Sequence, residues 1–354
     1  MIVVKKMKVK IPGRLVGEGQ PCFTIAEAGV NHNGDIKLAK KLIDIAREAG
    51  ADAIKFQTFK ADTLVTKSAA KARYQKETTG AAESQLEMIK KLELTKKDFY
   101  ELYNYARKKG IIFLSSPFDK RSVDLLDKLG VPAFKIPSGE ITNFPLLKHI
   151  ARKKKPIILS TGMSTLGEIE EALEALGEEG VEEIILLHCV SCYPAKVEDM
   201  NLKVMNTLRY AFGLPVGLSD HTVGITIPIA AVALGACVIE KHFTLDKSLP
   251  GPDHRASLEP DELKQMIKAI RDVEKAMGSG IKIPTAAEEE NKKLARRSLV
   301  AKVDIAKGAV ITEEMLDLKR PGGGIEPKYM NMIIGRKTSG SIKHDELITF
   351  TKLM

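Results

Sequence analysis

Short apolar runs and amphipathic stretches alternate along the first 280 residues. An apolar run bounded by polar residues predicts a buried β-strand, whereas apolar residues repeated every three or four positions predict a helix packed on one face. The predicted strands are FTIAEAG, DAIKFQTF, IIFLSSP, AFKIPSGE, PIILSTG, EIILLHCVS, PVGLSD and CVIEKHFT. The predicted helices are DIKLAKKLIDIAREAG, KKDFYELYNYARKKG, RSVDLLDKLG, FPLLKHIARKKK, LGEIEEALEALGEEG, LKVMNTLRYAFG, GITIPIAAVALGA and PDELKQMIKAIRDVEKAMG.

Eight strand–helix units over about 250 residues predict an α/β fold of the (β/α)8 type, a TIM barrel, which we assign to residues 1–280. The alternative is a doubly wound open sheet. Such a sheet would carry a Gly-rich phosphate loop between a strand and a helix, and neither G-x-G-x-x-G nor a Walker sequence occurs in that context. The count of units therefore favours the barrel.

One unit contains a long, mostly polar insertion between Lys60 and Thr95. An insertion at the carboxyl end of a barrel strand often lies over the active site. A solvated surface loop is the other interpretation, and the sequence leaves both open.

The pattern changes after Gly280. Residues 281–296 are polar and predict a linker. Residues 297–354 contain the short β-type runs SLVAKVDI, AVITEEMLDLKRPG, IIGRKTSGSI and ELITF, which predict a small β-rich domain. A core of this size is marginal on its own, so we expect this domain to pack against the barrel or a second subunit.

The net charge of +9 is spread over helices that also carry Glu, and no basic run is interleaved with aromatic residues. This distribution argues against a nucleic-acid surface and favours small anionic substrates. No apolar run is long enough to cross a bilayer, and residues 1–14 contain too many lysines for a signal peptide. We therefore expect a cytoplasmic protein with no membrane partner.

Cys189 and Cys192 form a C-x-x-C sequence, which a redox pair or half of a zinc site would also have. The pair follows an apolar strand rather than opening a helix, and there is no second C-x-x-C. We expect buried, reduced thiols.

Polar or ionisable residues stand at the end of every predicted strand. Because barrel enzymes carry their catalytic groups at the carboxyl ends of the strands, this pattern predicts an active site there. The residues are Glu27, Lys55 with Gln57, Ser115 and Ser116, Lys135 with Ser138 and Glu140, Ser160 with Thr161, Ser191 with Tyr193, Ser219 with His221, and His242.

Lys55 and Lys135 lie within apolar strands, so each needs an anionic partner to offset its desolvation. Together with the serines they predict a cationic, hydroxyl-lined cup for a phosphate and a carboxylate. A Schiff-base lysine is the alternative, but imine chemistry needs only one lysine. Two lysines therefore favour anion binding.

His221 and His242 end consecutive predicted strands, so their imidazoles should be neighbours. Such a pair suits a divalent transition metal such as Mn²⁺, although either histidine alone would more often be structural. Arg320, in KRPGGGI, lies either in a plain surface turn or on a Gly-rich loop that presents it to a substrate.

Taken in order, IAEAGVNHNG, IKFQ, FKIPSGE, LSTGM, LLHC, YP, LSDHT, EKHFT, GPDH and KRPGGGI resemble the N-acetylneuraminate (sialic acid) synthase family over nearly the whole chain. The final segment resembles the antifreeze-like (SAF) domain of these synthases. The resemblance implies a transferase that joins phosphoenolpyruvate to an N-acetylmannosamine-type aldehyde with Mn²⁺, releasing phosphate. It also implies a homodimer with domain-swapped C-terminal domains.

The resemblance also implies roles for single residues. Metal ligands would be His221 and His242, and Glu27 would handle the attacking water. Phosphoenolpyruvate would be held by Lys55, Ser116, Lys135, Ser138, Ser160, Ser191 and Ser219. Glu140, Tyr193 and Asp253 would surround the sugar, and Arg320 would reach the site of the other subunit. Ser191 and Ser116 replace the Asn and Thr of well-known bacterial members, yet both keep a hydrogen-bonding side chain.

Three alternatives remain at this stage. Legionaminic and pseudaminic acid synthases share most of these motifs and would use a different 6-deoxy amino sugar. Octulosonate and heptulosonate synthases use phosphorylated sugars and would need an arginine cluster that the strand ends do not carry. A catalytically inactive sugar-binding barrel would have lost strand-end groups, and these are present.

Overall fold

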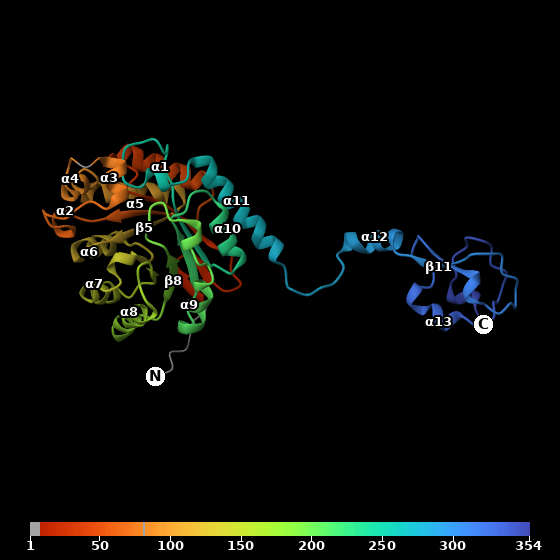
Figure 1. Ribbon diagram of the computed structural model, residues 1–354. Coiled ribbons are helices and arrows are strands. Elements are labelled where there is room, and N and C mark those ends of the chain that lie inside the picture. The colour runs from red at the N-terminus through yellow and green to blue at the C-terminus, as the bar shows by residue number, and fades with distance from the viewer. Residues whose placement is uncertain (1–7, 81) are drawn as a thin grey trace. The chain divides into compact units, whose positions relative to one another are not determined.

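The computed structural model describes residues 8–80 and 82–354. The chain divides into two compact units, one ending at Gly278 and the other beginning at Ser279 (Figure 1). Residues 1–7, part of the segment judged not to be a signal peptide, lie outside the described residues. No described helix is both long and apolar enough to cross a membrane.

The first unit is a barrel of eight parallel strands, as predicted. In space they follow the order β5-β4-β3-β10-β9-β8-β7-β6, and β5 lies against β6, which closes the ring. All seven residues of β3 are buried, which explains its uninterrupted apolar sequence. The strands are β3 (Phe23–Gly29), β4 (Ala53–Thr58), β5 (Ile112–Pro117), β6 (Phe134–Ile136), β7 (Ile157–Ser160), β8 (Ile184–Cys189), β9 (Val216–Asp220) and β10 (Val238–His242).

A layer of helices surrounds the strands (Figure 1). Local sequence sets their ends: α5 begins where the Thr95 hydroxyl accepts from the Asp98 amide, and it ends at Gly110 in a left-handed conformation. The helices are α1 (Ile36–Glu48), α5 (Lys96–Lys109), α6 (Lys120–Leu129), α7 (Phe144–Ala151), α8 (Leu166–Glu178), α9 (Val204–Phe212), α10 (Thr226–Ala233) and α11 (Pro260–Met277). Short 3-10 turns η1 (Ser138–Glu140), η2 (Val197–Asp199) and η3 (His254–Ala256) follow β6, β8 and β10.

An antiparallel hairpin of β1 (Lys8–Ile11) and β2 (Arg14–Gly17) precedes the barrel and was not predicted. Val9, Ile11 and Val16 pack with Phe23 and Ile25 at the amino ends of the strands. The hairpin therefore contributes to the core at this end of the barrel.

The insertion after β4 forms three short helices, α2 (Ala61–Leu64), α3 (Arg73–Thr79) and α4 (Gln85–Lys90). It lies at the carboxyl end of the strands, because it follows β4 directly.

The second unit contains α12 (Ala286–Ala295), a two-stranded sheet of β11 (Ser298–Ala301) and β12 (Leu316–Lys319), and α13 (Met330–Ile333). Three 3-10 turns complete it: η4 (Glu313–Met315), η5 (Pro327–Tyr329) and η6 (Phe350–Lys352). The stretch expected to be a plain polar linker includes α12, which a Thr285–Glu288 capping box begins. The core of the second unit includes Leu299, Ile311 and Ile348.

Candidate active site

Most of the predicted site residues lie at the carboxyl ends of the barrel strands, and many are buried there. Glu27 in β3, Lys55 in β4 and Lys135 in β6 point into a common cluster of charges. Lys55 Nζ lies 2.7 Å from Glu27 Oε2 and 3.6 Å from Glu240 Oε2, and Lys135 Nζ lies 3.4 Å from Glu240 Oε1. The barrel thus holds two cations and two carboxylates away from bulk water.

Hydroxyl groups at neighbouring strand ends complete this cluster. Lys55 Nζ donates to Ser116 Oγ at 3.2 Å and Lys135 Nζ to Ser160 Oγ at 2.8 Å. Ser219 Oγ donates to Glu240 Oε1 at 2.9 Å. Every one of these serines was predicted from the sequence, whereas Glu240 was not.

Glu240 is the main residue that sequence reasoning missed. It is buried in β10, two residues before His242, so both side chains project from the same side of the strand. This alternation within CVIEKHFT was the signal that could have revealed it. Without Glu240 the two lysines would face each other with only one carboxylate nearby.

Burial and neighbouring charges shift the pKa values of these four groups in different directions. Burial raises the pKa of Glu27 to about 7, a shift that Lys55 opposes. Burial would also raise the pKa of Glu240, but Lys135 and Lys55 outweigh it and hold that pKa below its ordinary value. Burial lowers the pKa of Lys135, whereas Glu240 and Glu27 outweigh burial at Lys55 and raise its pKa.

Gly162, in the LSTGM motif, lies close to the hydroxyls of Ser138 and Ser191. A Cβ at this position would come within 3 Å of both Ser138 Oγ and Ser191 Oγ and would also meet Cys189 Sγ at 3.2 Å. The Gly162 amide donates to Ser138 Oγ at 2.9 Å. Glycine is therefore required here for close approach of the backbone to these groups.

The two histidines are neighbours, with ring centroids 5.5 Å apart. His221 Nδ1 donates to the Val190 carbonyl at 2.8 Å, so Nε2 is the ring nitrogen that could bind a metal. Burial, together with His221, lowers the pKa of His242 well below its ordinary value, which keeps that imidazole neutral.

An observation on unpaired atoms tests whether a metal fits here. His242 Nδ1 and Glu27 Oε1 are buried and have no hydrogen-bond partner among the described residues. Glu27 Oε1 and the His242 ring both lie within 3.5 Å of the point where a Cβ on Gly29 would stand. The two neighbouring imidazoles suit a divalent transition metal whose remaining ligands would be water or substrate. Within residues 8–80 and 82–354, no group of three or more His, Cys, Asp or Glu residues forms a metal cluster by itself.

Tyr193 and Asp253 border the histidines. The Tyr193 ring lies 4.1 Å from that of His221 and 5.3 Å from that of Tyr74 in the insertion. Asp253 Oδ2 lies 3.9 Å from His242 Nδ1, and burial raises the pKa of Asp253 to about 6. These side chains form the wall between the histidines and the insertion.

A cavity of about 140 Å³ opens at this wall. Tyr193, His242 and Asp253 line one side, and residues of the insertion, including Tyr74 and Met88, line the other. The insertion therefore covers part of the site, which favours the first of its two interpretations.

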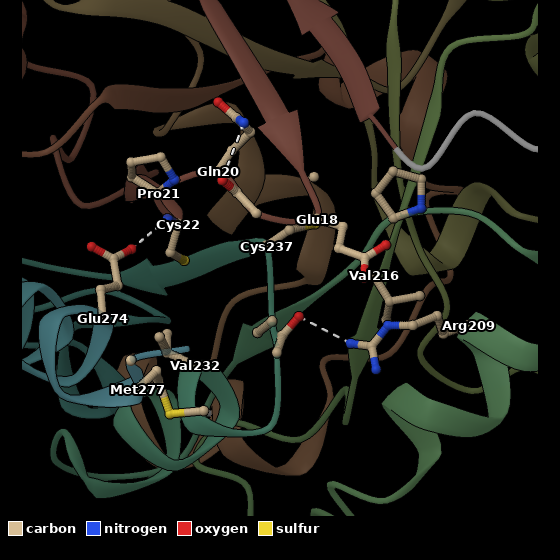
Figure 2. Close-up of a pocket in the computed structure, with 16 residues that line it drawn as sticks. Glu18, Gln20, Pro21, Cys22, Arg209, Val216, Val232, Cys237, Glu274 and Met277 are labelled. Atoms are coloured by element: carbon tan, nitrogen blue, oxygen red, sulfur yellow. Dashed lines mark hydrogen bonds between the residues drawn. The ribbon is translucent and has the colours of Figure 1, made fainter. Parts of the chain in front are cut away.

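A larger pocket, of about 640 Å³, lies at the opposite end of the barrel, where β9 begins at Val216 (Figure 2). Two of its charged groups already have partners: Arg209 donates to the Gly235 carbonyl at 2.9 Å, and Glu274 pairs with Arg271 at 3.0 Å. The strand-end groups described above do not line it, so we do not assign the chemistry to this pocket.

Three predicted residues stand apart from the cluster. Glu140 is half-buried in η1 and accepts from Asn143 Nδ2 at 2.7 Å. Arg320 is exposed in the second unit, directly after β12. Cys192 is exposed, contrary to the expectation of buried thiols, because it lies in the loop after β8; Cys189 is buried, and both are free.

Comparisons with known proteins agree with this geometry. The model of the NeuB family matches residues 42–282, and that of the SAF domain matches residues 296–354. The N,N'-diacetyllegionaminic acid synthase of Campylobacter jejuni is 57% identical over 92% of this chain and 98% of its own length. The enzyme of the same name from Legionella pneumophila is 53% identical over 91% of this chain and 92% of its own.

Among solved structures, N-acetylneuraminic acid (sialic acid) synthetase from Leptospira borgpetersenii has a TM-score of 0.70 and 38% identity, covering 80% of this chain and 94% of its own. The barrel, the SAF domain and these identities lead to one conclusion. The chain belongs to the NeuB family of sialic-acid-type synthases and carries a SAF domain at its carboxyl end.

Proposed function

We propose that this enzyme condenses phosphoenolpyruvate with an acetamido sugar aldehyde and water to give a legionaminic-type nonulosonic acid and phosphate. The observation that carries the proposal is the buried cluster of Lys55, Lys135, Glu27 and Glu240 beside two neighbouring histidines. Burying two lysines costs free energy and is not needed to stabilise the barrel. A substrate that carries both a phosphate and a carboxylate would explain why both lysines are present.

The lysines and hydroxyls support phosphoenolpyruvate binding. Lys55 and Lys135 would hold the phosphate and the carboxylate of phosphoenolpyruvate. Ser116 and Ser160 would orient the two lysine ammonium groups, and Ser219 would orient the Glu240 carboxylate. The hydroxyls of Ser138 and Ser191, which lie close to Gly162, would donate to phosphate oxygens. The raised pKa of Lys55 keeps it an ammonium, which argues against the Schiff-base alternative for that residue.

His221 and His242 would hold the divalent metal, for which we propose Mn²⁺. When bound, the metal would polarise the aldehyde oxygen as a Lewis acid. Tyr193 and Asp253 would orient the sugar next to it, because both border the histidines. Glu140 lies near the end of β6 and is assigned to the sugar by resemblance alone.

The bond changes follow from these positions. Carbon 3 of phosphoenolpyruvate attacks the aldehyde carbon, and cationic character develops at carbon 2. Water adds to carbon 2 and passes a proton to Glu27, whose pKa of about 7 suits a base near neutral pH. The former aldehyde oxygen takes up a proton to become a hydroxyl. Phosphate then leaves with the bridging oxygen while the hydroxyl on carbon 2 loses its proton, so that carbon 2 becomes the ketone of the product. Holding both reactants in one cup supplies the orientation that the reaction needs.

The sugar we propose is a 6-deoxyhexose with two acetamido groups, rather than the N-acetylmannosamine expected from the sequence motifs. Both relatives named N,N'-diacetyllegionaminic acid synthase exceed 50% identity, whereas the solved sialic acid synthetase has 38%. Dimerisation, the domain swap and the role of Arg320 in a partner's site remain predictions from the resemblance.

The proposal is tested by phosphate release from phosphoenolpyruvate with Mn²⁺, comparing 2,4-diacetamido-2,4,6-trideoxymannose with N-acetylmannosamine. We expect release that depends on the sugar, is faster with the diacetamido sugar and is abolished in His221→Ala. Release that favours N-acetylmannosamine would change the proposed sugar and keep the reaction. No release with either aldehyde from folded, metal-loaded protein would favour the inactive barrel.

A further inference from the structure

The cavity next to His242 combines several polar groups with a wall of mostly apolar side chains. Apart from Tyr193, His242, Pro252 and Asp253, it is lined by Val30, Gln57, Phe59, Leu64, Tyr74, Gln75, Met88, Ile89, Leu92 and Phe118. Seven of these ten side chains are aliphatic, Met or Phe. Only Gln57, Tyr74 and Gln75 offer hydrogen bonds on that side.

The apolar wall is a packed structure rather than a chance exposure. Val30, Phe59 and Leu92 form a core cluster of their own, separate from the barrel core. Phe59 contacts Phe118 edge to face, with ring centroids 6.1 Å apart. The cavity is therefore bordered by side chains whose positions are fixed by one another.

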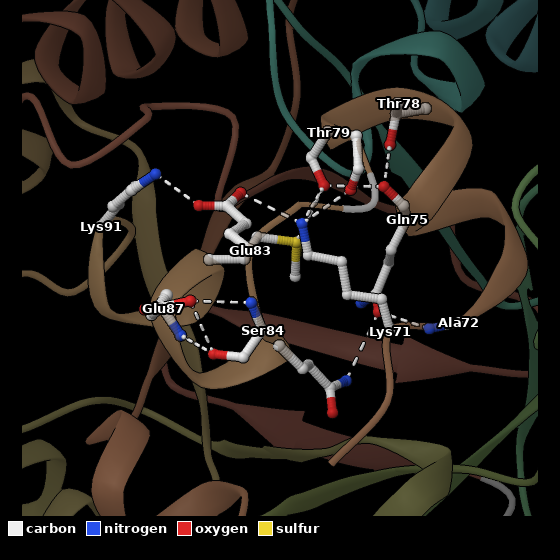
Figure 3. A network of polar contacts seen from close by, with 12 residues as sticks. Lys71, Ala72, Gln75, Thr78, Thr79, Glu83, Ser84, Glu87 and Lys91 are labelled. Carbon is white, nitrogen blue, oxygen red and sulfur yellow. Dashed lines mark hydrogen bonds and ion pairs between the residues drawn. The ribbon is translucent and has the colours of Figure 1, made fainter. Parts of the chain in front are cut away.

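Polar contacts fix the shape of the insertion that supplies this wall (Figure 3). The Lys71 side chain is only 2% exposed, and its Nζ donates to Thr79 Oγ1 at 2.9 Å and to the Gly80 carbonyl at 3.0 Å. Lys71 also pairs with Glu83 at 3.1 Å, and Glu83 in turn pairs with Lys91. One buried lysine thereby ties the end of α3 to the turn that precedes α4.

The base of the insertion is clamped in the same way. Glu93 accepts from the Ala61 amide at 2.6 Å and pairs with Lys60 at 2.7 Å, joining the two ends of the insertion. Gly34, in the NHNG motif, lies so close to the Lys91 carbonyl that any Cβ there would clash. The wall is thus formed before a sugar binds. Its apolar side chains can therefore favour one sugar over another.

We infer that this apolar cavity binds the end of the acceptor sugar farthest from the aldehyde, and that it selects a terminal methyl and an acetamido group over hydroxyls. The inference rests on the proposed function, which places the aldehyde at His221 and His242. The far carbons of the open chain then extend toward the insertion, where Met88, Leu92 and Phe59 supply apolar contacts.

The size and chemistry of the cavity match those groups. Its volume of about 140 Å³ is close to that of engineered apolar cavities of about 150 Å³ that take up benzene, so it can hold a methyl and an acetamido group together. Gln57 and Gln75 can pair with the amide of the acetamido group. The terminal hydroxyls of N-acetylmannosamine would lose water where they contact Leu64, Met88 and Phe118, because these three side chains form no hydrogen bonds with a hydroxyl.

The test compares kcat/KM for the two sugars in wild-type enzyme, Met88→Ala, Leu64→Gln and the control Met205→Ala. Met205 is fully buried in α9 and does not line the cavity, so its truncation loses the same atoms from another core. We expect the wild type to prefer the diacetamido-trideoxy sugar about 100-fold. Met88→Ala should reduce this preference about 10-fold, and Met205→Ala should keep it.

Leu64→Gln provides a gain that misfolding cannot imitate. Its amide would pair with sugar hydroxyls, so kcat/KM for N-acetylmannosamine should rise about 10-fold. A preserved preference in both Met88→Ala and Leu64→Gln would overturn this inference while the proposed function stands. A wild-type preference for N-acetylmannosamine would overturn the proposed sugar and this inference together.

Discussion

The two ends of the barrel strands differ in chemistry, although they belong to the same short segments. In β3 and β4, Ile25 pairs with Ala53, and two residues later Glu27 pairs with Lys55. The first pair lies in the apolar core with the β1–β2 hairpin, and the second forms the charged cluster. A step of two residues stays on one face of a strand, so the change occurs within the barrel interior. Stability and chemistry are thus separated along each strand.

At the amino ends of the strands, the barrel interior is filled by apolar side chains. Ile25, Leu114, Ile158 and Ile185 are all at most 1% exposed. The carboxyl ends instead hold buried charges, and the desolvation of these charges lowers the stability of the fold. A bound anionic substrate would offset this loss by pairing with the lysines. Substitutions at the two ends should therefore affect different measurements.

The largest expected effect is on activity and concerns Lys135. Lys135→Met removes the cation that binds Ser160 and Glu240 and nearly preserves its volume. We expect kcat/KM for phosphoenolpyruvate to fall about 1,000-fold or more, because a desolvated cation opposite an anion contributes about 4 kcal/mol. Lys148→Met, which removes a surface lysine paired with Glu178, is the control and should leave kcat/KM unchanged. Near-normal kinetics in Lys135→Met would refute its role as an anion ligand.

A second prediction concerns the pair that joins the two histidine-bearing strands. Lys241 and Asp220 are fully buried, pair at 2.5 Å and stand in register on β10 and β9. Lys241→Met leaves the Asp220 carboxylate unpaired, so the free energy of unfolding should fall by about 3 kcal/mol or more. Affinity for Mn²⁺ should fall about 10-fold or more, because the pair fixes the strand ends that carry His221 and His242.

The double variant Lys241→Met/Asp220→Asn separates the two effects. It removes the unpaired charge, so much of the lost stability should return. Denaturant unfolding and calorimetric titration with Mn²⁺ measure both quantities. Unchanged Mn²⁺ affinity in Lys241→Met would show that the pair has no positioning role.

The smallest expected effect belongs to the apolar end. Ile185→Ala should lower the free energy of unfolding by about 2 kcal/mol or more, because it leaves a cavity in the core beneath the hairpin. The kcat/KM of the folded enzyme should change by less than about twofold. A large loss of activity without a loss of stability would contradict the separation of the two ends.

The sequence was sufficient to predict the barrel, because each strand and helix has its own periodic pattern. It was not sufficient for the β1–β2 hairpin, whose strands of four residues, KVKI and RLVG, carry too little pattern. Helix α12 was missed because none of its residues is buried, so its polar sequence AAEEENKKLA lacks the apolar periodicity of the other helices; the Thr285–Glu288 capping box is its local signal. Packing therefore identifies the hairpin, whereas helix capping identifies α12.

The candidate site was predictable in part for a similar reason. The rule that barrel chemistry lies at strand ends indicated Lys55, Lys135 and the serines. It did not indicate Glu240, which lies two residues before the end of β10. The apolar wall was not predictable, because Leu64, Met88 and Leu92 come together only when Lys71 and Glu93 fold the insertion. Long-range contacts of this kind leave no periodic trace in the sequence.

The most direct test of the central claim follows the bridging oxygen of phosphoenolpyruvate. The substrate is labelled with ¹⁸O between carbon 2 and phosphorus and is turned over with Mn²⁺ and the diacetamido sugar. If Lys55, Lys135 and Glu27 direct water to carbon 2, all of the label will appear in the released phosphate. Label retained in the sugar acid would mean that the phosphorus–oxygen bond breaks instead, and it would contradict the account.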